Sequence, residues 1–188
     1  MREKRRWWEI LVQTQAPERL VFLDETGADT KMVRRYGWGP RSSRVISHVP
    51  HGHWKTTTFV AALRATGLTA PLVLDSPMNS ESFLAYVVQF LIPTLRGGDI
   101  VVMDNLSSHK QAGVGEAIRG AGAEVFYLPP YSPDLNPIEK GFAKLKTLLR
   151  HHAERTTAAL WARIGKLIDM FTPTECCNYF HSCGYRAN

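Results

Sequence analysis

Runs of consecutive apolar residues predict buried strands along the chain. Five runs have this character, at residues 19–24, 45–49, 56–63, 99–104 and 124–128. Residues 72–74 predict a further short strand or an extended loop. Two of the runs, 19–24 and 99–104, close on an aspartate. Between the first two runs, a stretch rich in glycine and charge predicts a hairpin with its loop at 37–40.

Apolar positions at three- and four-residue spacing predict helices in the rest of the chain. They lie at residues 79–93, 110–121, 136–150 and 156–171, and residues 1–19 predict a short helix or arm. Hairpin strands therefore come first, and strands that alternate with helices come later. This order predicts an α/β fold whose mixed sheet is antiparallel on one side, parallel on the other, and flanked by helices.

Composition narrows the class of protein. The 188 residues are 44% hydrophobic and 21% charged, which is typical of one globular domain and excludes disordered, collagen-like and coiled-coil chains. No apolar run approaches the ~20 residues that a membrane helix needs. The basic N-terminus has no apolar stretch behind it, so it is not a secretory signal. Three clustered cysteines, Cys176, Cys177 and Cys183, favour a reducing, cytoplasmic setting.

The net charge of +6 is unevenly distributed. Residues 1–60 carry +5, residues 61–139 carry −4, and residues 140–188 carry +5. A basic surface with an acidic middle suits a metal-dependent enzyme that acts on nucleic acid, because cationic side chains hold phosphates and carboxylates hold cations. The same charge is also found in basic proteins that bind no nucleic acid.

Two of the acids follow predicted strands. Asp24 and Asp104 each end an apolar run, and ligands gather at strand ends in open α/β sheets. If the two strands are parallel neighbours, both carboxylates point into one crevice and repel each other unless a cation neutralises them. Mg²⁺ prefers oxygen ligands of this kind. An isolated strand-end aspartate can equally cap a turn or a helix.

Glu139 has two interpretations. Asn136 and Pro137 fit the N-cap and first residue of a helix, with Glu139 at the third position. Taken alone, this pattern predicts a capping box in which Glu139 bonds the backbone amide of Asn136. A catalytic role depends on the other acids.

Five segments carry a resemblance to a known family. They are FLDET (22–26), YGWGP (36–40), GHWKTTTFVAALR (52–64), VVMDNLSSHK (101–110) and PPYSPDLNPIE (129–139). Thirty-four residues separate Asp104 from Glu139. With these motifs the chain resembles, over residues 20–180, the catalytic domain of a mariner-superfamily DDE transposase of the bacterial insertion-sequence type.

The resemblance implies a ribonuclease-H-like catalytic domain over residues 20–188. By position, Asp24, Asp104 and Glu139 match the family's catalytic, metal-binding acids. The implied cofactor is Mg²⁺, with two ions and with Mn²⁺ able to substitute. The implied reaction is cleavage of DNA strands at the element's ends, followed by transfer of the freed 3′-hydroxyl to target DNA.

The resemblance also implies partners. These are transposon-end and target DNA, a second copy in a homodimer, and a separately encoded helix-turn-helix half, since the residues before Asp24 are too few for such a module. The sequence thus predicts a fragment, a frameshift product or a remnant, located in the cytoplasm at the nucleoid. Two alternatives remain: a non-catalytic relative that pairs with or inhibits a full-length transposase, and a ribonuclease-H-like nuclease.

Neighbours of the acids are candidates for supporting roles. The family pattern suggests Asn105, His109 and Asn136, with His109 orienting a phosphate or water, or merely capping the next helix. Glu25 is expected to point away from Asp24, because adjacent strand residues face opposite sides. Asp134 is expected to have a structural role.

Basic residues are candidates for DNA contact. The hairpin region supplies Arg34, Arg35, Arg41, Arg44 and Lys55, and the segment after Glu139 supplies Lys140, Lys144, Lys146 and Arg150. A solvated helix face would look the same as the second set. Trp38 and Trp54 are expected to pack in the core or at a sheet edge rather than stack on bases. The cysteines lack a C-x-x-C pair, which argues against zinc.

Overall fold

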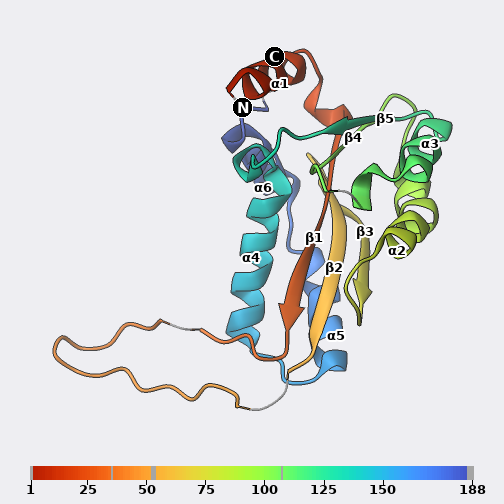
Figure 1. The fold of residues 1–188 in the computed structure, drawn as a ribbon. Coiled ribbons are helices and arrows are strands. Elements are labelled where there is room, and N and C mark those ends of the chain that lie inside the picture. The colour runs from red at the N-terminus through yellow and green to blue at the C-terminus, as the bar shows by residue number, and fades with distance from the viewer. Residues whose placement is uncertain (1, 35, 52–53, 107, 186–188) are drawn as a thin grey trace.

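The computed structural model describes residues 2–34, 36–51, 54–106 and 108–185. Figure 1 shows the elements in chain order. They are α1 (Arg2–Gln13), β1 (Leu20–Asp29), β2 (Thr56–Arg64), β3 (Gly67–Leu74), α2 (Ser80–Tyr86), β4 (Ile100–Met103), α3 (Ala112–Gly120), β5 (Glu124–Tyr127), α4 (Pro137–His152), α5 (Thr157–Ile168) and α6 (Pro173–Ser182). Short helical turns are η1 (Pro17–Arg19), η2 (Val87–Leu91), η3 (Ile92–Thr94), η4 (Ser108–Lys110) and η5 (Pro133–Leu135).

The strands form one mixed sheet in the order β3-β2-β1-β4-β5. β1 pairs with β2, and β2 with β3, in antiparallel fashion. β1 pairs with β4, and β4 with β5, in parallel fashion. The sheet is thus antiparallel on one side and parallel on the other, which confirms the predicted fold class.

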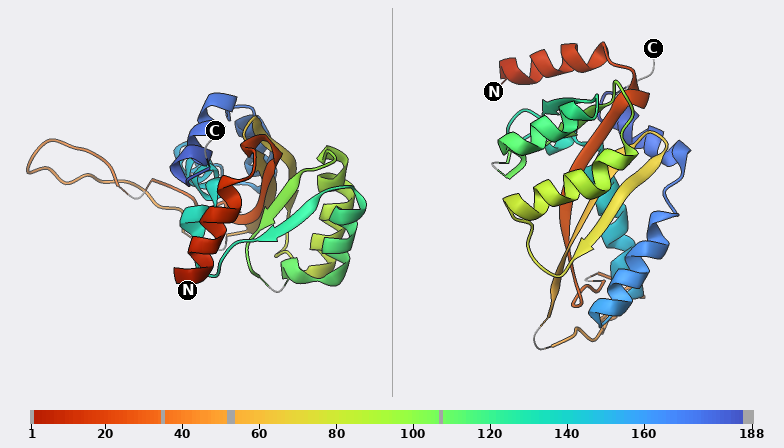
Figure 2. Two further views of the ribbon diagram at one scale, coloured as in Figure 1. Left: turned by 90° about the horizontal axis from the view of Figure 1, so that it is seen from above. Right: turned by 90° about the vertical axis from the view of Figure 1, so that its right-hand side faces the viewer.

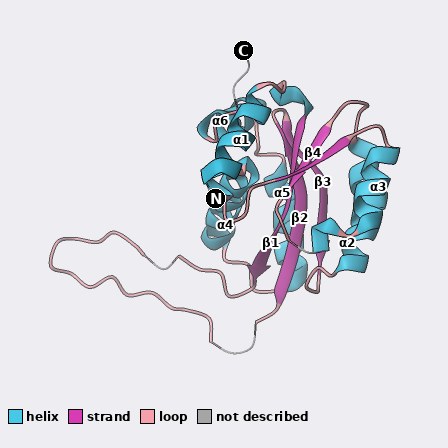
Figure 3. Cartoon of the chain, turned by 45° about the horizontal axis from the view of Figure 1, so that its top comes forward, coloured by secondary structure: helices cyan, strands magenta, loops and turns pink. Residues whose placement is uncertain are grey.

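Helices cover both faces of the sheet, as Figures 2 and 3 show. Leu20 and Phe22 of β1 lie in a core shared with α4, α5 and α6. Val21 and Leu23 lie in the opposite core, shared with α2, η2 and α3. Side chains alternate along a strand, so burial on both faces explains why β1 is continuously apolar in sequence.

One predicted strand is wrong. Residues 45–49 form no strand; Val45, Ile46 and Val49 are 51%, 81% and 61% exposed. β1 continues to Asp29 and pairs there with Thr56, so the described residues between them (30–34, 36–51, 54 and 55) have no place in the sheet. These described residues form a long loop that extends away from the sheet (Figure 1). Trp38, expected to pack, is fully exposed on this loop.

The N-terminal segment was predicted to be a short helix or an arm, and the structure shows the helix α1. Trp8 and Val12 of α1 are buried against the core of α4 and α6. The indole Nε1 of Trp8 donates to the Tyr185 hydroxyl over 3.2 Å. Among the residues that the structure describes, no helix is long and apolar enough to cross a membrane.

Candidate active site

The central strands place two of the acids. β1 and β4 are parallel and pair Phe22 with Val102. Asp24 and Asp104 each come two residues later along their chains, and both line the same cavity. β4 ends at Met103, so the edge of β1 that faces β4 loses its partner at this point. The sequence predicted that Asp24 ends its strand, whereas it lies in the middle of β1. The crevice forms because β4 stops, not because β1 does.

The third acid comes from a helix start. α4 begins at Pro137 directly after the proline-rich loop, which places Glu139 in its first turn. Asp24, Asp104 and Glu139 line a single cavity of about 370 Å³, together with Asn105 and Asn136. The structure therefore brings together the three acids that the sequence selected, from three separate elements.

Asn136 does not act as the sequence pattern alone predicted. Its backbone occupies the N-cap position of α4, but its side chain makes no capping bond. Its Nδ2 instead donates to Oδ2 of Asp24 over 2.8 Å. The capping-box interpretation is therefore wrong for Asn136. The side chain is 3% exposed and its Oδ1 has no partner among the described residues, which leaves a buried acceptor at the cavity.

In the metal-free protein, burial disfavours the ionised form of the Asp24 side chain. Burial raises its pKa to about 7, and repulsion by Glu139 and Asp104 adds to the rise, while the Glu25 backbone N–H opposes it. Two acids that raise the pKa of a third must lie close enough to interact. A cation in the cavity would relieve this repulsion.

His109 lies under the site. It is fully buried, and its ring stacks on Phe83 with centroids 4.3 Å apart. Its Nδ1 lies 2.6 Å from Oδ1 of Asp104, and its Nε2 lies 3.6 Å from Oε2 of Glu25. Although burial opposes protonation, these two acids raise the His109 pKa to about 9. Burial likewise pushes the Asp104 pKa upward, but His109, the Leu106 N–H and Lys110 outweigh it and lower the pKa.

Glu25 is a site residue that sequence reasoning missed. It points away from Asp24, as expected, but this direction brings its Oε2 to 3.6 Å from Nε2 of His109. Alternation along the strand correctly placed Glu25 on the opposite face. Nothing in the sequence indicated that the histidine five residues after Asp104 would fold back to that face.

The cavity fits a hard divalent cation by its donor chemistry. Its acids supply carboxylate oxygens, they repel one another, and the Asn136 Oδ1 is an unpartnered oxygen beside them. Within the described part of the chain, no three acidic, histidine or cysteine side chains lie close enough together to hold a metal ion as they stand. The acids thus surround a shared space without forming a finished coordination shell. The three cysteines are free.

The basic candidates lie in two places. Arg34, Arg41, Arg44 and Lys55 are exposed on the long loop, and Arg35 lies outside the described residues. On α4, Lys140 is exposed, and Lys146 and Arg150 are half-buried. Lys144 contacts Glu175 and donates to the Met170 carbonyl, so its ammonium is occupied by the protein itself.

Two further expectations have structural answers. Arg5 of α1 forms an ion pair with Asp134 and also bonds the Ser132 hydroxyl over 3.0 Å. Asp134 thus fixes α1 to the loop before α4, in keeping with a structural role. Trp54 is 54% exposed and lies under the Lys31 ammonium, 4.1 Å from the ring centroid, rather than in the core.

Comparison with known proteins identifies the family. The family model described as "DDE superfamily endonuclease" matches residues 19–160. The chain belongs to this family, and its matched region contains all three acids of the cavity. No curated protein matches the chain by sequence.

Several solved structures have a fold similar to that of this chain. The pre-cleavage Mos1 transpososome superposes with a TM-score of 0.80 at 16% identity, over 98% of this chain and 59% of that chain. The Mos1 strand transfer complex gives 0.78 at 18% identity, over 98% and 58%. The isolated catalytic domain of Mos1 mariner transposase gives 0.74 at 16%, over 97% and 87%. The chain therefore has the ribonuclease-H-like fold of a mariner transposase catalytic domain and spans about three-fifths of the longer relatives.

Proposed function

We propose that this chain is the catalytic part of a transposase that cleaves DNA strands and joins a 3′-hydroxyl to target DNA. The observation that carries the proposal is the convergence of Asp24, Asp104 and Glu139 on one cavity, at the point where parallel strands lose their pairing. Membership of a family described as endonucleases supports this proposal.

The three acids would hold the metal cofactor, proposed as two Mg²⁺ ions for which Mn²⁺ can substitute. Bound there, such ions would activate the attacking oxygen and stabilise the leaving one. The relatives support the choice of metal, since paired-end complexes of Mos1 contain Mn and Mg. Asn136 would hold Asp24 in place through its amide and offer Oδ1 to a polar group in the cavity.

DNA is the proposed substrate. The relatives are described as a paired-end complex with the left transposon end and as a strand transfer complex. The proposed phosphate contacts of this chain are basic residues of the long loop and of α4. They are Arg34, Arg35, Arg41, Arg44, Lys55, Lys140, Lys146 and Arg150. Asn105 lines the cavity and is exposed, so it can meet the DNA beside the scissile bond.

The setting of the protein is also proposed by analogy. It comprises a bacterial insertion sequence, a homodimer, an end-binding helix-turn-helix half encoded separately, and location in the cytoplasm at the nucleoid. The structural likeness to transpososomes supports an assembly of this type. A non-catalytic partner and a simple nuclease are the competing functions.

The deciding experiment is nicking of supercoiled plasmid in Mn²⁺. Wild type should nick, and Asp104→Asn should lose at least a hundredfold in rate, since a cation ligand becomes neutral. Asp75→Asn, which changes an exposed acid outside the cavity, should nick like wild type. Retained nicking in Asp104→Asn would refute the assignment of the acids.

A strand-joining assay separates the remaining functions. Donor oligonucleotides with a free 3′-hydroxyl should join to plasmid when wild type is present. Nicking without joining would favour a nuclease. Absence of both, even with an end-binding half added, would favour a non-catalytic partner.

A further inference from the structure

Asp104 lies where the sheet no longer holds the backbone. β4 ends at Met103, and Asp104 begins the loop that leads to η4. Asp24, by contrast, is fixed by the pairing of β1 with β2. A carboxylate in a loop needs other contacts if its oxygens are to keep one orientation.

The contacts of Asp104 gather on one oxygen. Its Oδ1 accepts from the Leu106 backbone N–H over 3.1 Å. The same oxygen lies 2.6 Å from Nδ1 of His109, a charge contact whose angles fall outside hydrogen-bond geometry. Among the described residues, Oδ2 has no comparable contact. One oxygen is therefore turned toward the protein and the other is left for the cavity.

His109 is itself held from two sides. Phe83 of α2 stacks against the ring with an angle of 27° between the planes. Glu25 of β1 faces the far nitrogen, Nε2, at 3.6 Å. A carboxylate oxygen lies near each nitrogen, one ring face is covered and the side chain is fully buried, so the imidazole has little freedom to rotate. A fully buried ring also cannot reach a DNA phosphate or a bulk water.

We propose that His109 and Glu25 are positioning residues for Asp104. In this arrangement Phe83 and Glu25 fix the imidazole, the imidazole fixes Oδ1, and Oδ2 is presented to the cation. The inference rests on the proposed metal site and adds residues to it from the opposite face of β1. Glu25 and Asp24 are adjacent in sequence, so one strand supports both aspartates of the site.

The sharpest test compares two amides at position 109. In His109→Asn the amide nitrogen takes the place of Nδ1, near Asp104. In His109→Gln it takes the place of Nε2, near Glu25. If the contact with Asp104 matters, Asn should keep Mn²⁺ affinity within about threefold of wild type, whereas Gln should lose about 10–100-fold, as for other groups that orient metal ligands.

The readout is Mn²⁺ affinity of the metal-free chain, from the electron paramagnetic resonance signal of unbound Mn²⁺, with the melting temperature beside it. Glu25→Gln should weaken Mn²⁺ binding in the same direction as His109→Gln. Asp99→Asn is the control, because it breaks a buried ion pair with Arg64 away from the cavity. It should lower the melting temperature and leave Mn²⁺ affinity unchanged.

Each outcome has one meaning. Equal Mn²⁺ affinities for His109→Asn, His109→Gln and wild type would overturn the positioning role while leaving the metal site intact. Affinity that simply follows melting temperature across all variants, Asp99→Asn included, would also overturn it. If wild type binds no Mn²⁺, or Asp104→Asn binds as wild type does, the proposed metal site fails first and this inference fails with it.

Discussion

At the scale of single residues, burial of the Asp24 carboxyl makes the stability of the fold depend on pH. Asp24 is buried among other acids, and its pKa is raised to about 7 from an ordinary value of 3.8. The folded state therefore binds this proton more tightly than the unfolded state does. Stability contributed by the protonated group is present below about pH 4 and is lost as the pH rises toward 7.

We expect Asp24→Asn to be more stable than wild type at pH 8 without metal, by a few kcal/mol, because each pKa unit corresponds to about 1.4 kcal/mol. The difference should vanish below about pH 3, where the wild-type carboxyl is protonated in both states. Urea unfolding at the two pH values measures it. The exposed Asp75→Asn serves as control, and a variant less stable than wild type at pH 8 would contradict the burial argument.

At the scale of elements, the sequence predicted the features that neighbouring residues determine. It did not predict contacts between residues that are far apart in the chain. Continuous apolar runs correctly predicted β1 and β4, and the family resemblance predicted that Asp104 and Glu139 belong to one site, as their shared cavity shows. The Asn136 side chain was assigned from neighbouring residues as a cap, but its partner, Asp24, lies 112 positions away. Likewise, Val45 and Ile46 have strand-forming side chains but no strand to pair with.

The Arg64–Asp99 pair joins the end of β2 to the chain just before β4. Arg64 donates to both Asp99 oxygens and to the Thr94 carbonyl, and the Arg96 N–H donates to Asp99. Although burial acts in the opposite sense, these bonds lower the Asp99 pKa. Since β4 runs from this pair toward Asp104, the ion pair stabilises the strand at the end away from the site.

Asp99→Asn should cost about 3–5 kcal/mol of unfolding free energy at pH 7, the range for removing one charge from a buried pair. A carboxyl with a lowered pKa stabilises the fold above the ordinary pKa, and the contribution is lost as the pH falls through the folded value. The difference between variant and wild type should therefore shrink toward pH 3. Urea unfolding across this pH range tests the prediction, and a difference independent of pH would contradict it.

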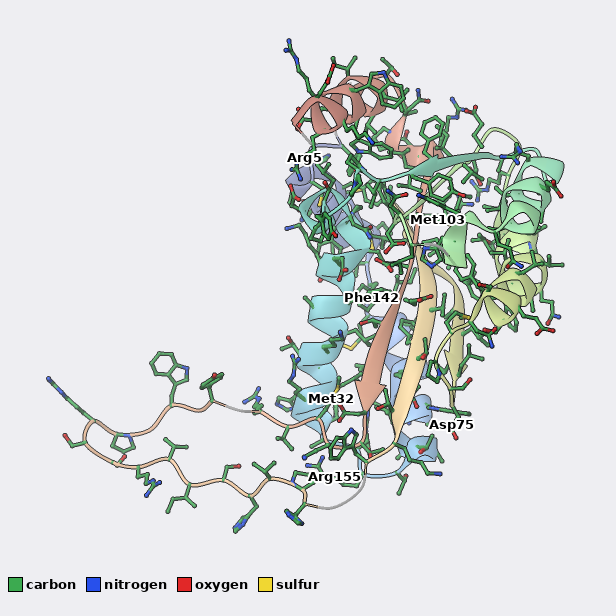
Figure 4. All side chains as sticks on the ribbon, viewed as in Figure 1. Arg5, Met32, Asp75, Met103, Phe142 and Arg155 are labelled. Carbon is green, nitrogen blue, oxygen red and sulfur yellow. The ribbon has the colours of Figure 1, made fainter. Side chains whose placement is uncertain are left out.

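At the scale of the whole molecule, the described part of the long loop stands apart from the folded core. The loop leaves and rejoins the sheet at neighbouring points, since the Thr30 N–H donates to the Lys55 carbonyl over 3.3 Å. Figure 4 shows side chains of the described part of the loop standing clear of the core, whereas Met32 and Arg155 lie at its base. Arg155 donates to the carbonyls of Thr30 and Met32, which anchors the base.

Replacing residues 34–54 with a short glycine-serine turn should therefore preserve the fold, because it keeps both anchors and the pairing of Asp29 with Thr56. The melting temperature should stay within a few degrees of wild type. The replacement removes Arg34, Arg35, Arg41 and Arg44. If these hold phosphates, the slope of log affinity for duplex DNA against log salt should become shallower by about 3 to 4, because each phosphate that a cationic side chain neutralises contributes roughly 0.9 to it.

Fluorescence anisotropy with a labelled duplex at several salt concentrations measures this slope. Lys166→Ala, which removes an exposed charge from α5, should leave it unchanged. A folded loop variant with the wild-type slope would remove the loop from the DNA interface and leave Lys140, Lys146 and Arg150 beside Glu139 as the phosphate contacts. A shallower slope with plasmid nicking retained would show that the loop holds DNA while the cavity performs the cleavage.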